Sequence, residues 1–308
     1  MNRATILLVQ ASLLGACGGG APAAAHPEPG AECVAVDTSV PLAVSRIEGD
    51  GVVVHTLIAP HSSAAVTSHV VETEGHLVVF DTQLFRGYAR QLREYVDGLG
   101  KPIDRVVITH GHPDHYLGLE LFEDAPSWAF EETRVDIQQR QRFHIRMHRE
   151  TERECDAVAE RAVVPTNVLE EGDYELDGIT LRFSRARDAE DNDQLIVHVP
   201  AARALILQDL VANEVHPYSA TGMIPHWIEV LRAAQETYPD IEHVLAGHGA
   251  PGGPEVIPEM IGYLEGAARI HEADLEPEAF RDAFLSGWPD RRGTYIVEMM
   301  VTMLRSRR

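Results

Sequence analysis

Basic residues are scarce in this chain of 308 residues. Lys and Arg together number 26, against 48 Asp and Glu, which gives a formal net charge of -22 and a pI near 5.0. Nucleic-acid binding requires a basic patch or stripe. The composition therefore argues against a nucleic-acid partner, and we expect a small-molecule substrate instead. Nothing in the composition defines an oligomeric state.

Long apolar runs are also absent, so we expect no transmembrane helix. A short apolar stretch at 6–14 follows a charged start, which is typical of a secretory signal. The sequence Leu-Gly-Ala-Cys that ends at Cys17 resembles the lipobox of bacterial lipoproteins. We predict a lipoprotein-type signal peptide at 1–17 and a flexible tether at 18–40. The protein is then exported to the periplasm or cell envelope, with the outer membrane as the expected location and a lipid anchor at Cys17 as its only membrane contact. An ordinary signal peptide with a chance cysteine is the alternative.

Cysteine is rare, with three residues in the whole chain. Beyond Cys17 there are Cys33 and Cys155, and the sequence leaves open whether they form a disulfide in an oxidising compartment. No cysteine has metal-ligand spacing. No Ser-His-Asp or Cys-His pattern has the context of a nucleophile, and no Gly-rich loop precedes a helix to bind phosphate. The chain therefore offers no obvious side-chain nucleophile.

Metal-binding side chains, in contrast, are concentrated in one stretch. The motif Thr-His-Gly-His-Pro-Asp-His at 109–115 directly follows a segment at 105–108 that has the composition of a strand. Imidazole and carboxylate are ligand types for Zn, Fe and Mn. A strand that ends in such a cluster places it at a sheet edge, where ions can reach it. We interpret this motif as the centre of the active site.

Two later strands end in the same kind of residue. A segment at 204–207 runs into Asp209, and one at 241–246 runs into His248. The pattern of apolar and turn residues predicts other strands at 51–58, 68–73, 76–81, 127–130, 174–176, 179–183 and 194–199, and helices at 88–99, 119–122 and 225–238. Strands and helices in this order are typical of α/β packing.

Two regions have a different character. Residues 131–161 are rich in charge, and we expect a mostly helical, solvated excursion there. His144 and His148 in this region share a helix face, and we interpret them as a surface pair. From residue 254 onward we expect two or three helices.

Together these residues resemble the metallo-β-lactamase superfamily, roughly over 45–249. The resemblance implies an α/β fold of the four-layer αββα type over 41–308, with a site for one or two divalent metal ions. Asp81 matches a supporting Asp that is common in the family. Carried over position by position, the resemblance implies that His110 and His112 hold the first ion. The second ion would be held by Asp114, His115 and His248. Asp209 would bridge the two ions.

This chain departs from the family at the third ligand of the first ion. Where the family usually has Gly-His-Thr, upstream of the bridging Asp, this chain has Ala-Glu-Asp at 189–191. We expect Glu190 to ligate the first ion, as a Glu does in alkylsulfatases of this fold. The alternatives are that Asp188 or Asp191 reaches the metal, or that only the second site is filled. We expect Zn, with the preference shifted toward Fe or Mn because a carboxylate makes the site harder. A second departure, Leu117 in place of a Gly, is expected to affect helix packing only.

The resemblance implies a metal-dependent hydrolase. A metal-bound water or hydroxide would attack an ester-type bond of a carboxylic ester, lactone, phosphoester or sulfate ester. Asp114 is expected to orient this water as well as to ligate. His216, in the loop after Asp209, is a candidate proton donor, or else a residue that structures the loop. Weaker candidates for the same pocket region are His61, Tyr218, His226 and Trp227.

Three other functions are considered. β-Lactam hydrolysis is less favoured, because the family's lactamases do not combine a Glu in the first site with a bridging Asp. An iron-dependent redox enzyme, such as a persulfide dioxygenase, is an alternative of the same fold. A metal-binding module without catalysis is the non-enzymatic alternative.

Overall fold

The computed structural model describes residues 36–151, 157–220 and 223–307. The predicted signal peptide, the tether up to residue 35, and all three cysteines lie outside these ranges. Residues 36–40 have no regular secondary structure. Within the described ranges, no helix is both long and apolar enough to cross a membrane.

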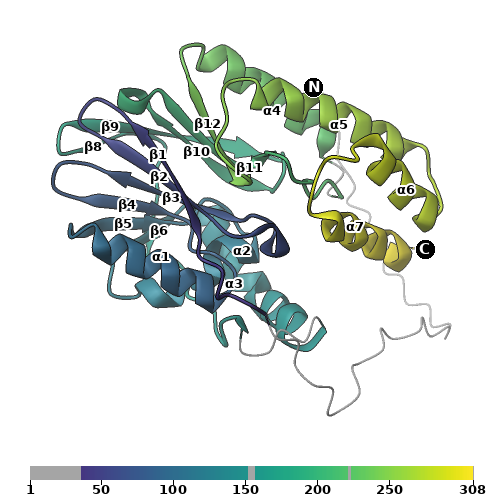
Figure 1. Cartoon of the computed structure of the whole chain (residues 1–308), viewed down its shortest axis with the longest axis horizontal. Coiled ribbons are helices and arrows are strands. Elements are labelled where there is room, and N and C mark those ends of the chain that lie inside the picture. The colour runs from purple at the N-terminus through teal and green to yellow at the C-terminus, as the bar shows by residue number, and fades with distance from the viewer. Residues whose placement is uncertain (1–35, 152–156, 221–222, 308) are drawn as a thin grey trace, which may run out of the picture.

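Two β-sheets lie face to face (Figure 1). In the described part of the chain, the first sheet has its strands in sequence order: β1 Ala43–Glu48, β2 Val53–Ile58, β3 Thr67–Glu72, β4 Leu77–Phe80, β5 Ile103–Val107, β6 Ser127–Ala129 and β7 Asn167–Val168. The second sheet has the order β12-β11-β10-β9-β8, with β8 Gly172–Leu176, β9 Ile179–Arg187, β10 Asp193–Val199, β11 Ala204–Ala212 and β12 His243–His248.

Helices cover the outer surfaces of both sheets (Figure 1). The helices on the side of the first sheet are α1 Arg86–Gly98, the single turn α2 Pro113–Tyr116 and α3 Glu131–Arg146. Those on the second sheet are α4 Ile224–Thr237 and α5 Val256–Glu272, and the last two, α6 Pro277–Gly287 and α7 Thr294–Arg307, pack beyond them. Short 3-10 turns are η1 His61–Ser63, η2 Leu117–Phe122 and η5 Pro200–Ala202, and a π turn, η3 Met147–Thr151, continues α3.

Alternation along the strands explains the layers. Val79 of β4 packs toward α1, in one core with Leu92. Its neighbours Val78 and Phe80 point the other way, into the core between the sheets, which they share with Phe183 of β9. Side chains of a strand alternate between its two faces, so each sheet is apolar on both sides. This confirms the four-layer αββα sandwich.

Some elements differ from the sequence pattern. β1 was not predicted, because it is an edge strand whose side chains are mostly exposed. The helix expected at 119–122 is part of the 3-10 turn η2, in which the departing residue Leu117 is fully buried. β11 continues past Asp209 to Ala212, with irregular pairing to β12 around Gln208.

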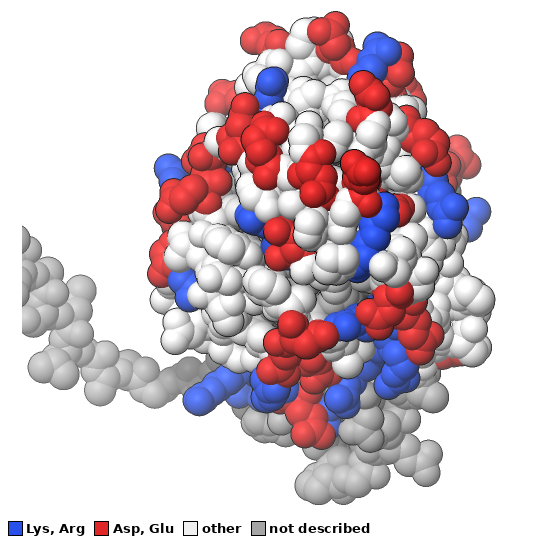
Figure 2. All heavy atoms as spheres, turned by 90° about the vertical axis from the view of Figure 1, so that its left-hand side faces the viewer, with Lys and Arg blue, Asp and Glu red and all other residues white. Residues whose placement is uncertain are grey.

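Acidic side chains are spread over the face shown in Figure 2, with Lys and Arg interspersed between them. No continuous basic surface is visible on this face.

Candidate metal centre

The predicted ligands come from five separate segments. His110 and His112 follow β5, and Asp114 and His115 lie on α2. The others lie in the turn between β9 and β10, within β11, and at the end of β12: Glu190, Asp209 and His248. The structure brings them into two groups, in each of which the candidate ligand atoms lie within 4.8 Å of one another: His110, His112, Glu190 and Asp209; and Asp114, His115 and His248.

Asp209 lies between the two groups. Its Oδ2 atom is 3.4 Å from Nε2 of His110 and 3.4 Å from Nε2 of His248. Its Oδ1 atom is 3.1 Å from Nε2 of His115. A β-carbon on Gly247 would collide with this carboxylate, so the glycine gives it room. One carboxylate thus faces ring nitrogens of both groups, as the bridging position requires.

Glu190 lies next to both histidines of the first group. Its Oε1 atom lies 3.4 Å from Nδ1 of His112, and its Oε2 atom 4.0 Å from Nε2 of His110. The neighbouring acids do not join the group. Asp188 is exposed, and Asp191 accepts hydrogen bonds from the backbone N–H groups of Gly111 (3.2 Å) and Asn192 (2.8 Å).

Among the described residues, four buried atoms of the cluster have no partner that meets hydrogen-bond geometry, although His115 Nε2 and Asp209 Oδ1 lie 3.1 Å apart as an ion pair. The four atoms are Nε2 of His110, Nε2 of His115, Oε2 of Glu190 and Oδ1 of Asp209. Buried polar atoms are nearly always partnered in native proteins, so each exception needs an explanation. Nitrogen and oxygen donors of this kind are those that divalent Zn, Fe and Mn prefer. The residues present therefore fit a divalent metal site.

Outer hydrogen bonds set the orientation of the ring nitrogens. Nδ1 of His115 lies 2.9 Å from Oδ2 of Asp81. Thr109 Oγ1 donates to the same oxygen at 2.7 Å and lies 3.0 Å from Nδ1 of His110. Nδ1 of His248 donates to the Ala64 carbonyl at 3.0 Å. Such partners fix the tautomer and leave Nε2 as the ligand atom, which all three rings direct toward the cluster.

Asp81 has a second anchor that the sequence did not reveal. Gln208 Nε2 donates to Oδ2 of Asp81 at 2.6 Å, and both side chains are fully buried. The one signal for this role is a glutamine in the otherwise apolar run of β11, immediately before Asp209. A buried polar side chain inside a strand needs a partner, and here the partner supports two histidines.

Proton affinity in the cluster reflects the close packing of acids and imidazoles. Burial lowers the pKa of His112, but the carboxylates of Glu190 and Asp209 outweigh burial and raise it to about 10. Burial raises the pKa of the Glu190 carboxyl well above its usual value. The pKa of Asp209 is well below its usual value, because the nearby imidazoles, His115 first, outweigh its burial. Despite its burial, the pKa of Asp114 is lowered as well, by His115 and His248, so the imidazoles favour the anionic forms of Asp209 and Asp114.

His216 is not in either ligand group. It is fully buried, and its Nδ1 atom lies 2.9 Å from the Tyr263 hydroxyl on α5. Burial, followed by the charge of Arg291, lowers the pKa of His216 to about 4. The ring is therefore neutral at neutral pH and ties the loop after β11 to α5.

The weaker pocket candidates lie elsewhere. Trp227 is fully buried in the core under α4 and donates to the Leu210 carbonyl at 3.0 Å, so it is not a pocket residue. Tyr218 is half-buried. It packs against the core between the first sheet and its helices and against the core between the second sheet and its helices. His61 begins the 3-10 turn that precedes Ala64, the residue whose carbonyl holds His248.

The interpretation of His144 and His148 as a surface pair is wrong. Both are buried, and Nδ1 of His144 lies 2.8 Å from the Tyr116 hydroxyl. The charged residues of α3 are exposed or half-buried, whereas Thr133, Ile137 and His144 face inward. The helix thus packs against α2, next to the metal-binding motif.

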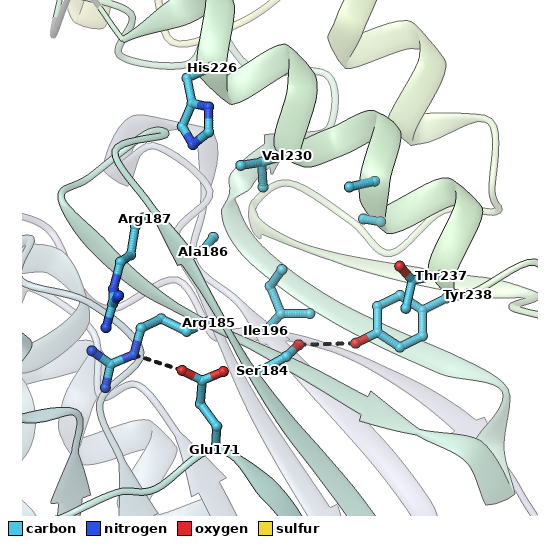
Figure 3. A pocket seen from close by; sticks show the side chains of 12 residues that line it. Glu171, Ser184, Arg185, Ala186, Arg187, Ile196, His226, Val230, Thr237 and Tyr238 are labelled. Atoms are coloured by element: carbon cyan, nitrogen blue, oxygen red, sulfur yellow. Dashed lines mark hydrogen bonds and ion pairs between the residues drawn. The ribbon is translucent and has the colours of Figure 1, made fainter.

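A groove of about 480 Å³ lies away from this cluster, between β9, β10 and α4 (Figure 3). The side chain of Ile196 lines the groove. At one end, Oγ of Ser184 lies 3.0 Å from the hydroxyl oxygen of Tyr238. His226 lines this groove, and no predicted metal ligand does. The groove is therefore separate from the metal centre.

Comparison with known proteins agrees with this geometry. The sequence model of the metallo-beta-lactamase superfamily matches residues 64–217. The chain belongs to that superfamily, and its fold is a metal-binding, hydrolase-type fold with a candidate His/Asp/Glu site. His248 lies beyond the matched segment, and the folded strand β12 is what brings it to the cluster.

Solved structures share the fold at low sequence identity. They include a metallo-beta-lactamase from Pontibacter korlensis, at 19% identity over 73% of this chain and 99% of that chain, with a TM-score of 0.57. The mono-zinc form of the FIM-1 metallo-beta-lactamase from Pseudomonas aeruginosa is 18% identical over 75% and 98%, with a TM-score of 0.54. A metallo-beta-lactamase from Hirschia baltica is 19% identical over 72% and 97%, with a TM-score of 0.53.

Proposed function

We propose that this protein is a metal-dependent hydrolase that cleaves an ester-type bond in a carboxylic ester, lactone, phosphoester or sulfate ester. The observation that carries the proposal is the convergence of buried, unpartnered ring nitrogens and carboxylate oxygens around Asp209. The first ion would be held by His110, His112 and Glu190, and the second by Asp114, His115 and His248, with Asp209 shared between them.

A divalent metal lowers the pKa of water and stabilises negative charge on the attacked group. The protein side chains supply position. Asp114 is the most accessible of the three carboxylates, with 20% of its side chain exposed, against 8% for Asp209 and 2% for Glu190. Asp114 is therefore placed to accept a hydrogen bond from the attacking water and orient it.

The ligand set bears on both substrate and metal. Glu190 with a shared Asp209 departs from the lactamase pattern, so we rank β-lactams below ester-type substrates. Three carboxylates make the site harder than an all-histidine site, so we expect Zn with Fe or Mn as competitors.

The test is metal analysis of the purified protein, followed by a chromogenic panel of esters, lactones, phosphoesters and sulfate esters with each metal restored. Asp209→Ala is expected to abolish activity and metal retention. Asp173→Ala, at an exposed position on β8, is the matched control. Assays run with and without oxygen separate hydrolysis from redox chemistry. A wild-type protein that holds no metal and hydrolyses nothing on the panel would contradict the proposal.

We also propose that the protein is exported and anchored by lipid at Cys17. Support comes from the order of charged start, apolar stretch and Cys at 1–17. Labelled palmitate is expected to enter the wild-type protein and not the Cys17→Ser variant. Equal labelling of both proteins would be inconsistent with the anchor.

A further inference from the structure

The segment that joins α6 to α7 lies against the loop after β11. The N–H group of Arg292 donates to the Glu214 carbonyl at 2.9 Å, and the N–H group of His216 donates to the Arg292 carbonyl at 2.9 Å. Val215 and Arg292 also form a parallel bridge. The joining segment lies beyond residue 217, where the superfamily match ends. The C-terminal part of the chain is thus in backbone contact with the metal-binding part.

Arg291 adds a side-chain contact at the same place. Its Nη1 atom donates to the carbonyl oxygens of Ala212 at 3.1 Å and Val215 at 2.6 Å. Its guanidinium carbon lies 4.7 Å from the centre of the Tyr263 ring. Within the described residues, the guanidinium pairs with loop carbonyls and an aromatic ring rather than with a carboxylate. A partly buried cation needs such partners, so its charge holds the loop in place.

The loop that Arg291 holds is paired with a predicted metal ligand. Ala212 pairs with His248 across β11 and β12, and the N–H group of Asn213 donates to the His248 carbonyl at 2.8 Å. The next residue, Gly249, has φ 95°, and the Asn213 carbonyl oxygen occupies the place of a β-carbon there. This contact excludes any other residue at 249. The backbone of 212–213 and the backbone of His248 are therefore joined by direct contacts.

We propose that Arg291 is a positioning residue for the second ligand set, acting through the carbonyls of Ala212 and Val215 on the backbone of His248. The inference rests on the proposed function. Ala64 holds the His248 ring from one side, and Arg291 holds its backbone from the other. Loss of Arg291 would release the end of β11 and move His248 Nε2 away from Asp114, which now lies 3.5 Å from it.

The three ligands that belong to the first ion alone have no such connection, whereas the shared Asp209 lies on β11. His110 and His112 follow β5 in the other sheet, and Glu190 lies in the turn between β9 and β10. Removing a residue that orients a ligand typically weakens metal binding by about 10- to 100-fold. The two ions should therefore respond differently to a change at Arg291.

The experiment titrates the metal-free full-length protein with Zn²⁺ by calorimetry and with Co²⁺ by visible absorption. Arg291→Met removes the donors and keeps the length of the side chain, and Arg291→Lys keeps a charge and donors. Arg269→Met, at an exposed position on α5, is the matched control. Arg291→Gln is measured in parallel, so that the comparison does not depend on the folding of one variant.

We expect Arg291→Met to bind the ion of the first ligand set nearly as the wild type does and the ion of the second set about 10-fold or more weakly, with a changed Co²⁺ spectrum for the second set. Arg291→Lys should restore most of the affinity, and Arg269→Met should match the wild type. If the wild type holds a single ion in the second ligand set, the same fall is expected for that ion. Unchanged affinities and spectra in the Arg291 variants would overturn the inference, whereas a wild type that binds no metal would overturn the proposed function itself.

Discussion

The Oε1 atom of Glu190 lies 3.4 Å from the Nδ1 atom of His112, in a group that also contains His110 and Asp209. The side chain of Glu190 is 2% exposed, and burial raises the pKa of its carboxyl well above the usual value. A dication beside the carboxyl would favour its ionised form. The properties of the first ion should therefore depend on this residue.

Substitution of Glu190 tests its assignment as a ligand. Glu190→Ala should lose one equivalent of metal, because it leaves two imidazoles and Asp209 at the first site. Glu190→His should keep both equivalents and shift the preference from Fe or Mn toward Zn. Metal content after dialysis against each ion measures the effect. Asp188→Asn, in the same turn and exposed, is the control, and full metal content in Glu190→Ala would show that Glu190 is not a ligand.

Asp81 should control metal affinity without touching the metal. It accepts hydrogen bonds from Thr109 and Gln208 and lies 2.9 Å from Nδ1 of His115. Asp81→Asn keeps the shape but weakens the partner that orients His115, so we expect about 10- to 100-fold weaker metal binding. Competition with a chromogenic chelator measures this change. Asp177→Asn, at a surface turn, should bind metal like the wild type, and equal affinities in both variants would refute the supporting role of Asp81.

The contact between His144 and Tyr116 predicts a stability effect. His144→Ala removes a buried hydrogen bond and leaves the Tyr116 hydroxyl without its partner, so we expect a loss of about 1–3 kcal/mol in the free energy of unfolding. Gln139→Ala, at an exposed position of the same helix, should change it by less than about 0.5 kcal/mol. Urea denaturation of the metal-free proteins gives both values. Similar values for the two variants would mean that the contact contributes nothing.

Acid should destabilise the protein through His69. This side chain is fully buried between Thr56 and Thr67, and burial lowers its pKa from 6.5 to about 4. The unfolded chain therefore binds the proton first as the pH falls. The stabilisation is complete above about pH 6.5 and decreases toward pH 4, by about 1.4 kcal/mol per pH unit.

His69→Gln should reduce this pH dependence of unfolding by about the same slope. His226→Gln, which changes an exposed histidine, should leave the slope as it is. Denaturant titrations at several pH values between 7 and 4 make the comparison. A slope in His69→Gln that equals the wild-type slope would show that His69 is not the responsible group.

Most of the strands and helices were predictable from local pattern. Runs of apolar and β-branched residues bounded by turn residues mark β2, β3 and β4, because these strands are buried on both faces. β1 escaped detection because an edge strand with exposed side chains has little apolar alternation. His144 was wrongly predicted to be exposed because it lies in a highly charged segment, although its own side chain is buried. A charged helix still buries one face when another helix packs on it, and α2 was too short to be recognised as that partner.

The sequence by itself determined the ligand types, the strand after whose end His110 to His115 lie, and the family to which the motif belongs. Only the tertiary structure decided which acid of 188–191 faces the cluster, since the turn directs Asp191 to backbone amides and Glu190 to His112. It also decided that Asp81 and Gln208 support the site and that Arg291 reaches the loop beside His248. These contacts join residues far apart in the chain, and their existence depends on how two sheets and their helices pack, which local sequence pattern does not encode.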